Sequence, residues 1–376
     1  MKILHLGDLH LGKRYQEYSF IEDQRYLLDQ VLERVEQERP ELVVIAGDVY
    51  DKSVPSEEAV KLFDDFLLRL LNRGLEVAVS SGNHDSAERL AFGNRYFREN
   101  LHISSSYHGS LESFSMQDEY GDLRVYMLPF VKPAMVRPYF PEEEIGSYTE
   151  AVRAVLREVP RDDIRKVLVA HQFVTGAQKS ESEEVNVGSL DNVDAEVFDA
   201  FDYVALGHIH RAQSVGRPGI RYCGTLLKYN ISEANQQKSF CFAELREKGN
   251  LKITTLPVLP LRDMVRIEGM FQDIISREHL AVCNPEDYTY IVLNDEQDVP
   301  HVMNRLRSHF KRVLGLAYNN ARTKAERMDL ERIHIEDKTP FELVGELFYK
   351  TNGQPMNAAQ SKLIQDLIED LWREQA

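Results

Sequence analysis

The stretch "YVALGHIHRA", residues 203–212, joins a short apolar run to two histidines that are one residue apart. An apolar run of this length indicates a buried β-strand, and side chains two residues apart in a strand point to the same face. We therefore expect His208 and His210 to point to one side at the end of this strand. Taken alone, the pair is either part of a metal site or two ordinary histidines at the edge of a core.

Four other short apolar runs are also followed directly by polar side chains. These are Asp8 and His10 after residues 2–6, Asp48 after 42–46, Asn83, His84 and Asp85 after 75–80, and His171 after 166–170. Ligands bind beyond the carboxyl ends of the strands in open α/β sheets, so parallel and adjacent strands would bring all five clusters to one edge. Burying this many carboxylates and imidazoles is costly unless a cation compensates for their lost hydration.

The types of ligand indicate the class of metal. Aspartate, asparagine and histidine without thiolate suit Mn²⁺ or a similar divalent ion better than structural zinc, which favours cysteine and histidine. The candidate ligands are Asp8, His10, Asp48, Asn83, His171, His208 and His210. They are too many for one ion once water or substrate also binds. We therefore predict two ions bridged by one carboxylate, as in sites for phosphoryl displacement.

The first part of the chain alternates apolar strands with amphipathic helices, which predicts an α/β fold with helices on the faces of a sheet. Helical patterns cover residues 20–38 and 56–73, and the second begins at Pro55 and Ser56. A further strand is predicted at 123–130. Three later strands, within 221–225, 238–245 and 251–259, follow without long helices between them. That order favours either a mixed sheet or a two-sheet sandwich.

We predict that the chain has three parts. The strand–helix part covers residues 1–257, and two prolines in "LPVLPLR" (256–262) mark its end. Residues 262–335 predict a small α+β domain, and residues 339–376 predict two helices joined by the turn "NGQP", a helix-turn-helix-like pair. The last helix has an apolar stripe that either packs on the body of the protein or docks a partner helix. Its members are Leu363, Ile364, Leu367, Ile368, Leu371 and Trp372.

The composition, with 43% hydrophobic and 28% charged residues, is ordinary for a soluble globular protein. No apolar stretch approaches the roughly 20 residues that span a membrane, and the N-terminus lacks the features of a signal peptide. Three widely spaced cysteines favour reduced thiols in a cytoplasm. The net charge of −16 differs from the basic surface usual in DNA-binding proteins. Either the substrate is small, or local patches and metals counter the charge, or a partner supplies the basic surface.

The polar clusters form the pattern D-x-H, GD, GNHD, H and GHxH, in this order, over residues 8–210. In this pattern the chain resembles the calcineurin-like metallophosphoesterase superfamily, whose fold is a two-sheet sandwich flanked by helices. Within that superfamily it most closely resembles the DNA-repair nuclease branch and its SbcD family of bacterial nuclease subunits. The segments "MKILHLGDLHLGK" (1–13) and "YCGTLLKYNISEANQQKS" (222–239) support the narrower match.

The resemblance implies a role for each site residue. One manganese ion would bind Asp8, His10, Asp48 and His210, and the other would bind Asp48, Asn83, His171 and His208. A metal-bound water would be the nucleophile. His84 would stabilise charge at the phosphate or protonate the leaving 3′ oxygen, and Asp85 would orient His84 through a hydrogen bond. Some relatives have a histidine where this chain has Asp51, so no phosphate contact is expected there.

The resemblance also implies the reaction and the partners. The chain would be a Mn-dependent DNA nuclease, a 3′→5′ exonuclease on double strands and an endonuclease on single strands and hairpins. It would act with an SbcC-type, SMC-like ATPase in DNA end processing, repair and recombination. Residues 262–335 would form a capping domain that faces DNA, and residues 339–376 would bind the ATPase. The alternatives are a small-molecule phosphodiesterase or phosphatase of the same superfamily, and a scaffold that has lost catalysis.

The sequence leaves the roles of two sets of residues undecided. The resemblance implies a homodimer, and the candidate contacts, which otherwise pack on the sheet, are Phe63, Phe66, Leu67 and Leu70. The second set consists of basic residues near the metal motifs and in segment 222–239. These residues, which either contact DNA phosphates or are ordinary surface charges, are Lys13, Arg14, Arg211, Lys228 and Lys238.

Overall fold

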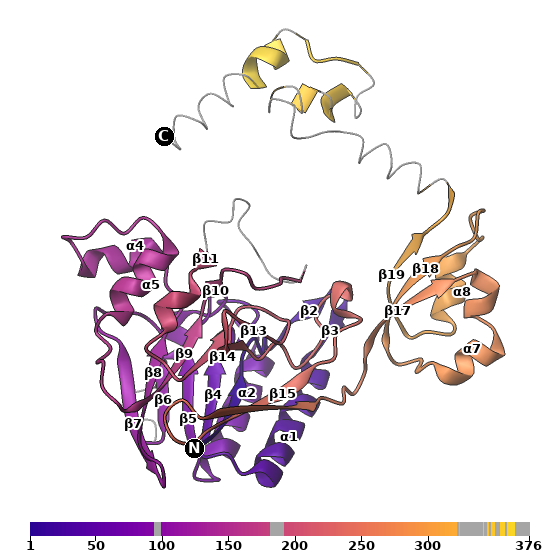
Figure 1. Ribbon diagram of the computed structural model, residues 1–376. Helices are drawn as coiled ribbons and strands as arrows, with labels where there is room; N and C mark the ends of the chain where they lie inside the picture. Colours follow the sequence, from indigo (N-terminus) through magenta and orange to yellow (C-terminus); the bar gives the residue numbers. More distant parts are fainter. Residues whose placement is uncertain are drawn as a thin grey trace. The chain divides into compact units, whose positions relative to one another are not determined.

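The computed structural model describes residues 1–93, 99–180 and 192–321, and beyond them 323, 341, 344–345, 347–349, 354–357 and 359–364 (Figure 1). The chain divides into two compact units. The larger one comprises residues 1–267, 275–291 and 302–316, and the smaller one residues 268–274, 292–301 and 317–376. All candidate site residues belong to the larger unit.

The first sheet of the larger unit has its strands in the order β16-β15-β1-β4-β5-β6. Its parallel strands are β1 (Lys2–Leu6), β4 (Leu42–Ala46), β5 (Glu76–Ser80) and β6 (Leu101–Ser104). The other two, β15 (Ser239–Leu245) and β16 (Leu251–Pro257), extend the sheet beyond β1 in antiparallel pairing. Strand β4 is buried along its whole length, as expected for a parallel strand that is covered on both faces.

The second sheet has the order β13-β14-β12-β9-β8-β7. Its strands are β7 (Glu112–Asp118), β8 (Gly121–Leu128), β9 (Arg165–His171), β12 (Tyr203–Gly207), β13 (Gln213–Val215) and β14 (Arg217–Tyr222). Strands β8, β9, β12 and β14 are parallel, and only β7 and β13 at the edges are antiparallel to their neighbours. The predicted α/β fold is confirmed, and of the two arrangements left open the structure has the two-sheet one.

Apolar side chains fill the space between the two sheets. Val44 and Ala78 of the first sheet belong to the same buried cluster as Val125, Val169 and Ala205 of the second. Strand β4 of the first sheet lies against β9 and β12 of the second. The sheets therefore form a sandwich, and their facing layers hold the strand ends in fixed positions relative to one another.

Helices cover the outer faces of the sandwich. Helices α1 (Ile21–Glu38) and α2 (Glu57–Leu71) pack on the first sheet, and α5 (Tyr148–Leu156) packs on the second. Helix α2 begins where the sequence predicted, because the Ser56 hydroxyl accepts the Ala59 N–H at 3.3 Å as an N-cap. Helix α5 starts with a capping box between Ser147 and Glu150.

The four candidate dimer contacts on α2 are buried in the protein's own core, so the prediction that they contact a second copy is wrong. Phe63, Phe66, Leu67 and Leu70 are only 4%, 1%, 8% and 0% exposed, and all four belong to the core between helix and sheet. They lie on the helix face that an amphipathic pattern directs toward a sheet. The alternative, packing on the protein's own sheet, is the one that the structure has.

Beyond residue 260 the predicted small α+β region is present. Its strands are β17 (Met264–Gly269), β18 (Tyr288–Leu293) and β19 (Arg312–Tyr318), in the order β17-β18-β19, with helices α6 (Phe271–Ile274), α7 (Arg277–Val282) and α8 (Val302–Arg307). In the predicted tail, residues 347–349 and 359–364 are helical. Leu367, Ile368, Leu371 and Trp372 lie outside the described residues.

Short elements complete the described chain. They are β2 (Arg14–Tyr15), β3 (Tyr18–Ser19), α3 (Ala87–Leu90), α4 (Pro133–Val136), η2 (Arg137–Tyr139), β10 (Phe173–Val174), β11 (Asn192–Val193), η3 (Ala195–Phe198) and η4 (Ile231–Glu233). Among the described helices, none combines the length and apolar character that crossing a bilayer demands. The cysteines Cys223, Cys241 and Cys283 are all free thiols.

Candidate metal centre

The five polar clusters converge, although not in the way the sequence suggested. They follow β1, β4 and β5 of the first sheet and β9 and β12 of the second, so two sheets contribute instead of one. The Asp8 carboxylate, after β1, accepts the His208 N–H, after β12, at 2.8 Å and 3.1 Å. This contact joins the two sheets at their carboxyl ends and brings all five clusters together.

One half of the centre consists of Asp8, His10 and His210. Their exposed fractions are 0%, 1% and 2%, and their ligand atoms lie within 4.8 Å of one another. The Nε2 atoms of His10 and His210 are 3.1 Å apart. Two imidazole nitrogens and a carboxylate oxygen therefore face one another in a space that is closed to solvent.

Asp48 lies at the middle of the centre. Its Oδ2 atom is 3.3 Å from His171 Nε2, 3.7 Å from His10 Nε2 and 4.0 Å from His84 Nε2. It also belongs to two metal-type groups, one with His10 and His84 and one with Asp8 and His171. A carboxylate with this set of neighbours can reach both halves of the centre.

The other half gathers around Asn83, an exposed residue. Its Oδ1 atom is 3.0 Å from His171 Nε2 and 3.0 Å from His208 Nδ1. At its second nitrogen, Nδ1, His171 donates to the Ala46 carbonyl oxygen at 2.8 Å. His208 and His210, although two residues apart, thus contact different halves of the centre.

The backbone at this edge is unusual for residues with side chains. Asp8, His10, Asp48 and His208 have positive φ values of 52°, 44°, 49° and 98°. Such conformations cost free energy and persist where the surrounding structure imposes them, often at functional sites. The residue before His208 is Gly207, and the backbone of Ala46 approaches it closely. A Cβ at position 207 would lie 1.8 Å from the Ala46 carbonyl oxygen, so only glycine fits.

Burial and mutual charge shift the pKa values of these side chains in opposite directions. Burial raises the pKa of Asp8 to about 6 and lowers that of His208 to about 3. Burial alone would lower the pKa of His171, but the charge of Asp48 outweighs it and raises the pKa to about 9. An ionised carboxylate in this buried centre is therefore stabilised by a positive partner, and the raised pKa of His171 makes its imidazole that partner for Asp48.

The donor set fits divalent metal ions. Buried carboxylate oxygens, an amide oxygen and imidazole nitrogens converge, and the metal-type groups among the described residues contain no thiolate. A divalent cation would favour ionised carboxylates and neutral imidazoles, and so replace the protons that now balance the charges. Asp8, His10, Asp48, Asn83, His171, His208 and His210 are the residues that would hold it.

His84 and Asp85 differ in their surroundings. The His84 side chain is 17% exposed, and its Nδ1 lies 2.9 Å from the Asp51 carbonyl oxygen. The backbone N–H of His84 donates to Asp48 Oδ1 at 2.9 Å. Asp85 accepts backbone N–H groups of Gly82, Val49 and Tyr50 at 2.9 Å, 3.2 Å and 3.0 Å. The expected hydrogen bond from Asp85 to the His84 ring is therefore wrong, because Asp85 fixes the loop and the Asp51 carbonyl holds the ring.

Two residues that the sequence analysis missed support the loop between Asp8 and Lys13. Gln24 of α1 donates to the His10 carbonyl oxygen at 2.7 Å, and the Tyr229 hydroxyl donates to the Leu9 carbonyl oxygen at 2.5 Å. Gln24 and Tyr229 are themselves joined at 2.9 Å. Their contacts are between residues far apart in the chain, so spacing gave no indication of them, although Tyr229 lies in the segment 222–239.

The basic residues near the centre divide into two groups. Lys13 pairs with Asp51 at 2.7 Å, Lys228 pairs with Asp263 at 2.9 Å, and Lys238 is only 6% exposed. Lys238 is therefore wrong as a candidate for contact with DNA. Arg14 and Arg211 are exposed at this edge, which keeps both available to a phosphate.

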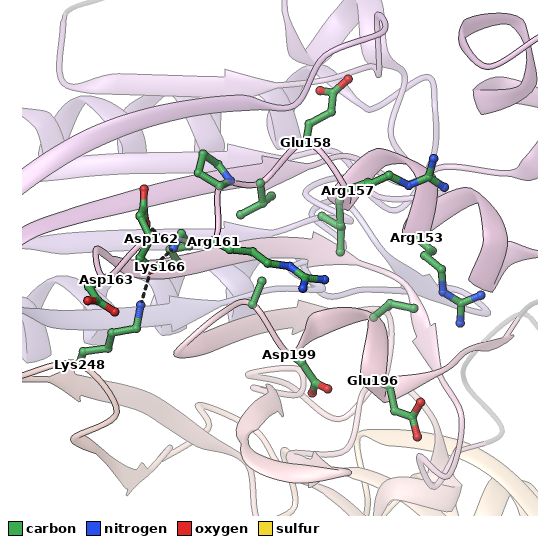
Figure 2. A pocket seen from close by; sticks show the side chains of 15 residues that line it. Arg153, Arg157, Glu158, Arg161, Asp162, Asp163, Lys166, Glu196, Asp199 and Lys248 are labelled. Atoms are coloured by element: carbon green, nitrogen blue, oxygen red, sulfur yellow. Dashed lines mark hydrogen bonds and ion pairs between the residues drawn. The ribbon is translucent and has the colours of Figure 1, made fainter.

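A broad open cavity of about 1300 Å³ lies elsewhere, between α5 and the start of β9 (Figure 2). It is lined by as many acidic as basic side chains, and Figure 2 shows Arg153 and Arg161 in the same lining as Glu196 and Asp199. Lys166 pairs there with Asp162 at 2.5 Å. Because its lining charges balance and no metal-type group of the described residues lies in it, this cavity is not the metal centre.

Comparison with known proteins defines the class of protein. Residues 1–212 match the family described as calcineurin-like phosphoesterase, and residues 260–352 match the one described as Type 5 capsule protein repressor C-terminal domain. The chain belongs to the calcineurin-like phosphoesterase family and is a metal-dependent hydrolase.

Full-length relatives narrow this assignment. The SbcD subunit of the SbcCD nuclease of Staphylococcus epidermidis is 34% identical over 376 residues, with 98% of each chain covered. Its counterpart from Staphylococcus saprophyticus is 31% identical over 384 residues, covering 100% of this chain and 99% of that one. The chain is therefore a member of the SbcD family of nuclease subunits. A dimetal phosphatase from Danio rerio matches 69% of this chain and 99% of its own, at 14% identity and a TM-score of 0.40.

Proposed function

We propose that the chain is a two-manganese DNA nuclease, a 3′→5′ exonuclease on double strands and an endonuclease on single strands and hairpins. It would act with an SbcC-type ATPase in DNA end processing, repair, recombination and replication. The observation that carries the proposal is the position of Asp48, within 4.0 Å of imidazole nitrogens from both halves of the centre. Nuclease relatives that match over nearly the whole chain support DNA as the substrate.

Each proposed ligand has a place in the geometry. Asp8, His10 and His210 would hold one ion, and Asn83, His171 and His208 the other, with Asp48 shared between them. Bound ions of this kind activate water and neutralise charge on the phosphate. The pairwise distances within each half, 3.1 Å for His10 and His210 and 3.0 Å for Asn83 and His208, support this division.

His84 would serve the leaving group. Because its Nδ1 faces the Asp51 carbonyl oxygen at 2.9 Å, that nitrogen carries the proton and the ring is held in one orientation. Its Nε2 points toward the centre, 4.0 Å from Asp48 Oδ2. A protonated His84 can then give the Nε2 proton to the departing 3′ oxygen or stabilise charge there. Asp85 would act indirectly, by fixing the loop that presents His84.

A small-molecule phosphodiesterase or phosphatase is the alternative, because the metal centre alone does not select the substrate. The regions beyond the sandwich favour the nuclease, since the second family match begins at residue 260 and runs to residue 352. We propose domain limits of 1–257, 262–335 and 339–376, in which the second domain caps the centre and faces DNA.

The test is cleavage of end-labelled duplex DNA by the full chain with Mn²⁺, beside hydrolysis of bis-p-nitrophenyl phosphate. We expect manganese-dependent shortening of the duplex from its 3′ ends and loss of this activity in chelator. A matched reaction with the His84→Gln variant controls for contaminating nucleases. Rapid hydrolysis of the small ester without any cleavage of DNA would overturn the proposal in favour of the alternative.

The partners are proposed from the same family membership. Residues 339–376 would dock the ATPase, so a chain that ends at residue 338 should fail to co-purify with the ATPase while it keeps its metal. Continued co-purification would place the dock elsewhere. A homodimer is also proposed, and because the core face of α2 is buried, its contacts must come from exposed residues such as Leu68, 47% exposed. The free cysteines support a cytoplasmic location.

A further inference from the structure

A buried carboxylate that the proposed reaction does not use lies beside the metal centre. Glu233, at the end of η4, is 0% exposed, and its Oε1 is 3.7 Å from Nδ1 of His210. Isolated carboxylates are almost never buried in proteins, because the loss of hydration is costly. The position of Glu233 therefore needs an explanation in its neighbours.

The two nitrogens of His210 face different partners. Nε2 is 3.1 Å from His10 Nε2, inside the half of the metal centre that Asp8, His10 and His210 form. Nδ1 faces Glu233. A histidine that binds a metal through one nitrogen carries its proton on the other and donates it to a carboxylate or carbonyl. Glu233 is the carboxylate that His210 Nδ1 faces, at an ion-pair distance of 3.7 Å and from outside the ligand set.

Lys238 holds Glu233 and His210 together. Its ammonium group is 2.5 Å from Glu233 Oε2 and donates to the His210 carbonyl oxygen at 2.9 Å. The lysine is 6% exposed, so both charges of the pair are removed from water. Such pairs add little stability, because desolvation offsets their attraction. A role in fixing the position of His210 explains the pair better than a role in folding.

We infer that Glu233 is a positioning residue for His210, and that the Glu233–Lys238 pair fixes the ring and the backbone of this metal ligand. The inference rests on the proposed function, because it takes His210 as a ligand. Glu233 touches neither substrate nor the reacting atoms. It acts through His210, so its loss should weaken one of the two metal sites selectively.

The experiment compares Mn²⁺ binding to the full chain in wild type, Glu233→Gln and Asp118→Asn. Asp118 is a matched control, because its carboxylate also pairs with a buried cation, Arg165, at the other end of the sandwich. We expect wild type and Asp118→Asn to bind two ions with the same affinities. In Glu233→Gln one of the two sites should lose affinity by about ten- to a hundredfold, the usual effect of losing such a partner, and the other should be unchanged.

Each outcome distinguishes this inference from the proposal on which it rests. Wild type that binds fewer than two Mn²⁺ ions would overturn both. Two ions in wild type with unchanged affinities in Glu233→Gln would overturn only the role of Glu233. If Glu233→Gln is too unstable for titration, the rise of its unfolding midpoint with Mn²⁺ reports the same affinity. A rise equal to that of wild type contradicts the inference, and a smaller rise supports it.

Discussion

The two ends of the sandwich differ in how their buried charged groups are paired. At the amino ends of the strands, Asp118 pairs with the N-terminal ammonium and with Arg165, each at 2.5 Å, and Arg165 also donates to the Gly121 carbonyl oxygen at 2.6 Å. At the carboxyl ends, Asp8, Asp48 and several imidazoles face one another, and four of these residues have a left-handed backbone. One end is complete in itself, and the other is arranged for a ligand.

Structural ion pairs and a functional site in this fold differ in the partners of their charged groups. A structural pair joins opposite charges whose remaining hydrogen bonds go to backbone carbonyls, as at Arg165. A site gathers groups that compete for the same protons, so their pKa values move apart, as at Asp8 and His171. We expect substitutions of the proposed ligands at the carboxyl end to weaken metal binding and substitutions at the amino end to leave it unchanged.

The largest effect should come from Asp48→Asn. The amide removes the carboxylate between the two halves, so we expect loss of two-ion binding and a fall in DNA cleavage on the order of a thousandfold or more, about 4 kcal/mol of barrier. Burial would raise the pKa of Asp48, but the charges of His171 and His10 outweigh it and hold that pKa well below its ordinary value. The ionised carboxylate therefore stabilises the fold near neutral pH, and without metal the variant should be less stable than wild type. Metal titration and denaturant unfolding in chelator check both parts. Two ions bound with wild-type affinity in the variant would mean that Asp48 is a structural residue, as Asp118 is.

The next largest effect should separate the metal ligands from the proposed general acid, His84, at the carboxyl end. His84→Gln should keep both ions and lose cleavage by about 10²–10⁴-fold, the usual range for a general acid. The structure makes this a demanding test, since His84 lies within 4.8 Å of the ligand atoms of His10 and Asp48. Bound manganese per chain, measured beside activity, decides the role. A variant that has lost one ion would make His84 a ligand.

Much of the fold could be predicted from the sequence, because its buried parallel strands are short apolar runs. Strands β1 and β4 have the predicted bounds, and helix α2 begins at the predicted cap, Ser56. The grouping of strands into two sheets could not be derived, since periodicity shows that a strand is buried but not which strand pairs with it. Thus the five clusters were expected on one sheet and lie on two.

The same limit applies to the site. The seven predicted ligands do converge, because each lies at or just beyond the carboxyl end of a strand, which fixes its position. The supporting contacts of Asp85, Gln24 and Glu233 join residues that are far apart in the chain or in loops, and these were predicted wrongly or missed. Lys238 shows why, since a lysine near a metal motif suggests a phosphate contact until its burial is known.

The smallest effect should come from the amino end, where Asp118→Asn removes one partner of Arg165. We expect a loss of about 1–3 kcal/mol at neutral pH, typical of hydrogen bonds to charged groups, with metal binding unchanged. Burial would raise the pKa of Asp118, but hydrogen bonds from Arg165 and the N-terminal ammonium outweigh it and lower the pKa from 3.8 to about 2. A depressed pKa means that the carboxylate stabilises the fold fully above about pH 5 and progressively less as the pH falls through 3.8 toward 2.

The difference in unfolding free energy between wild type and Asp118→Asn should therefore be constant from pH 7 to about pH 5 and shrink below that. Urea unfolding across this range, with chelator present, measures it. A difference that does not change with pH would show that Asp118 contributes through packing and neutral hydrogen bonds. The ion pair between Asp118 and Arg165 requires an ionised Asp118. Without a pH dependence, the amino end would therefore not be stabilised by charge pairing, and the contrast with the carboxyl end would be one of geometry alone.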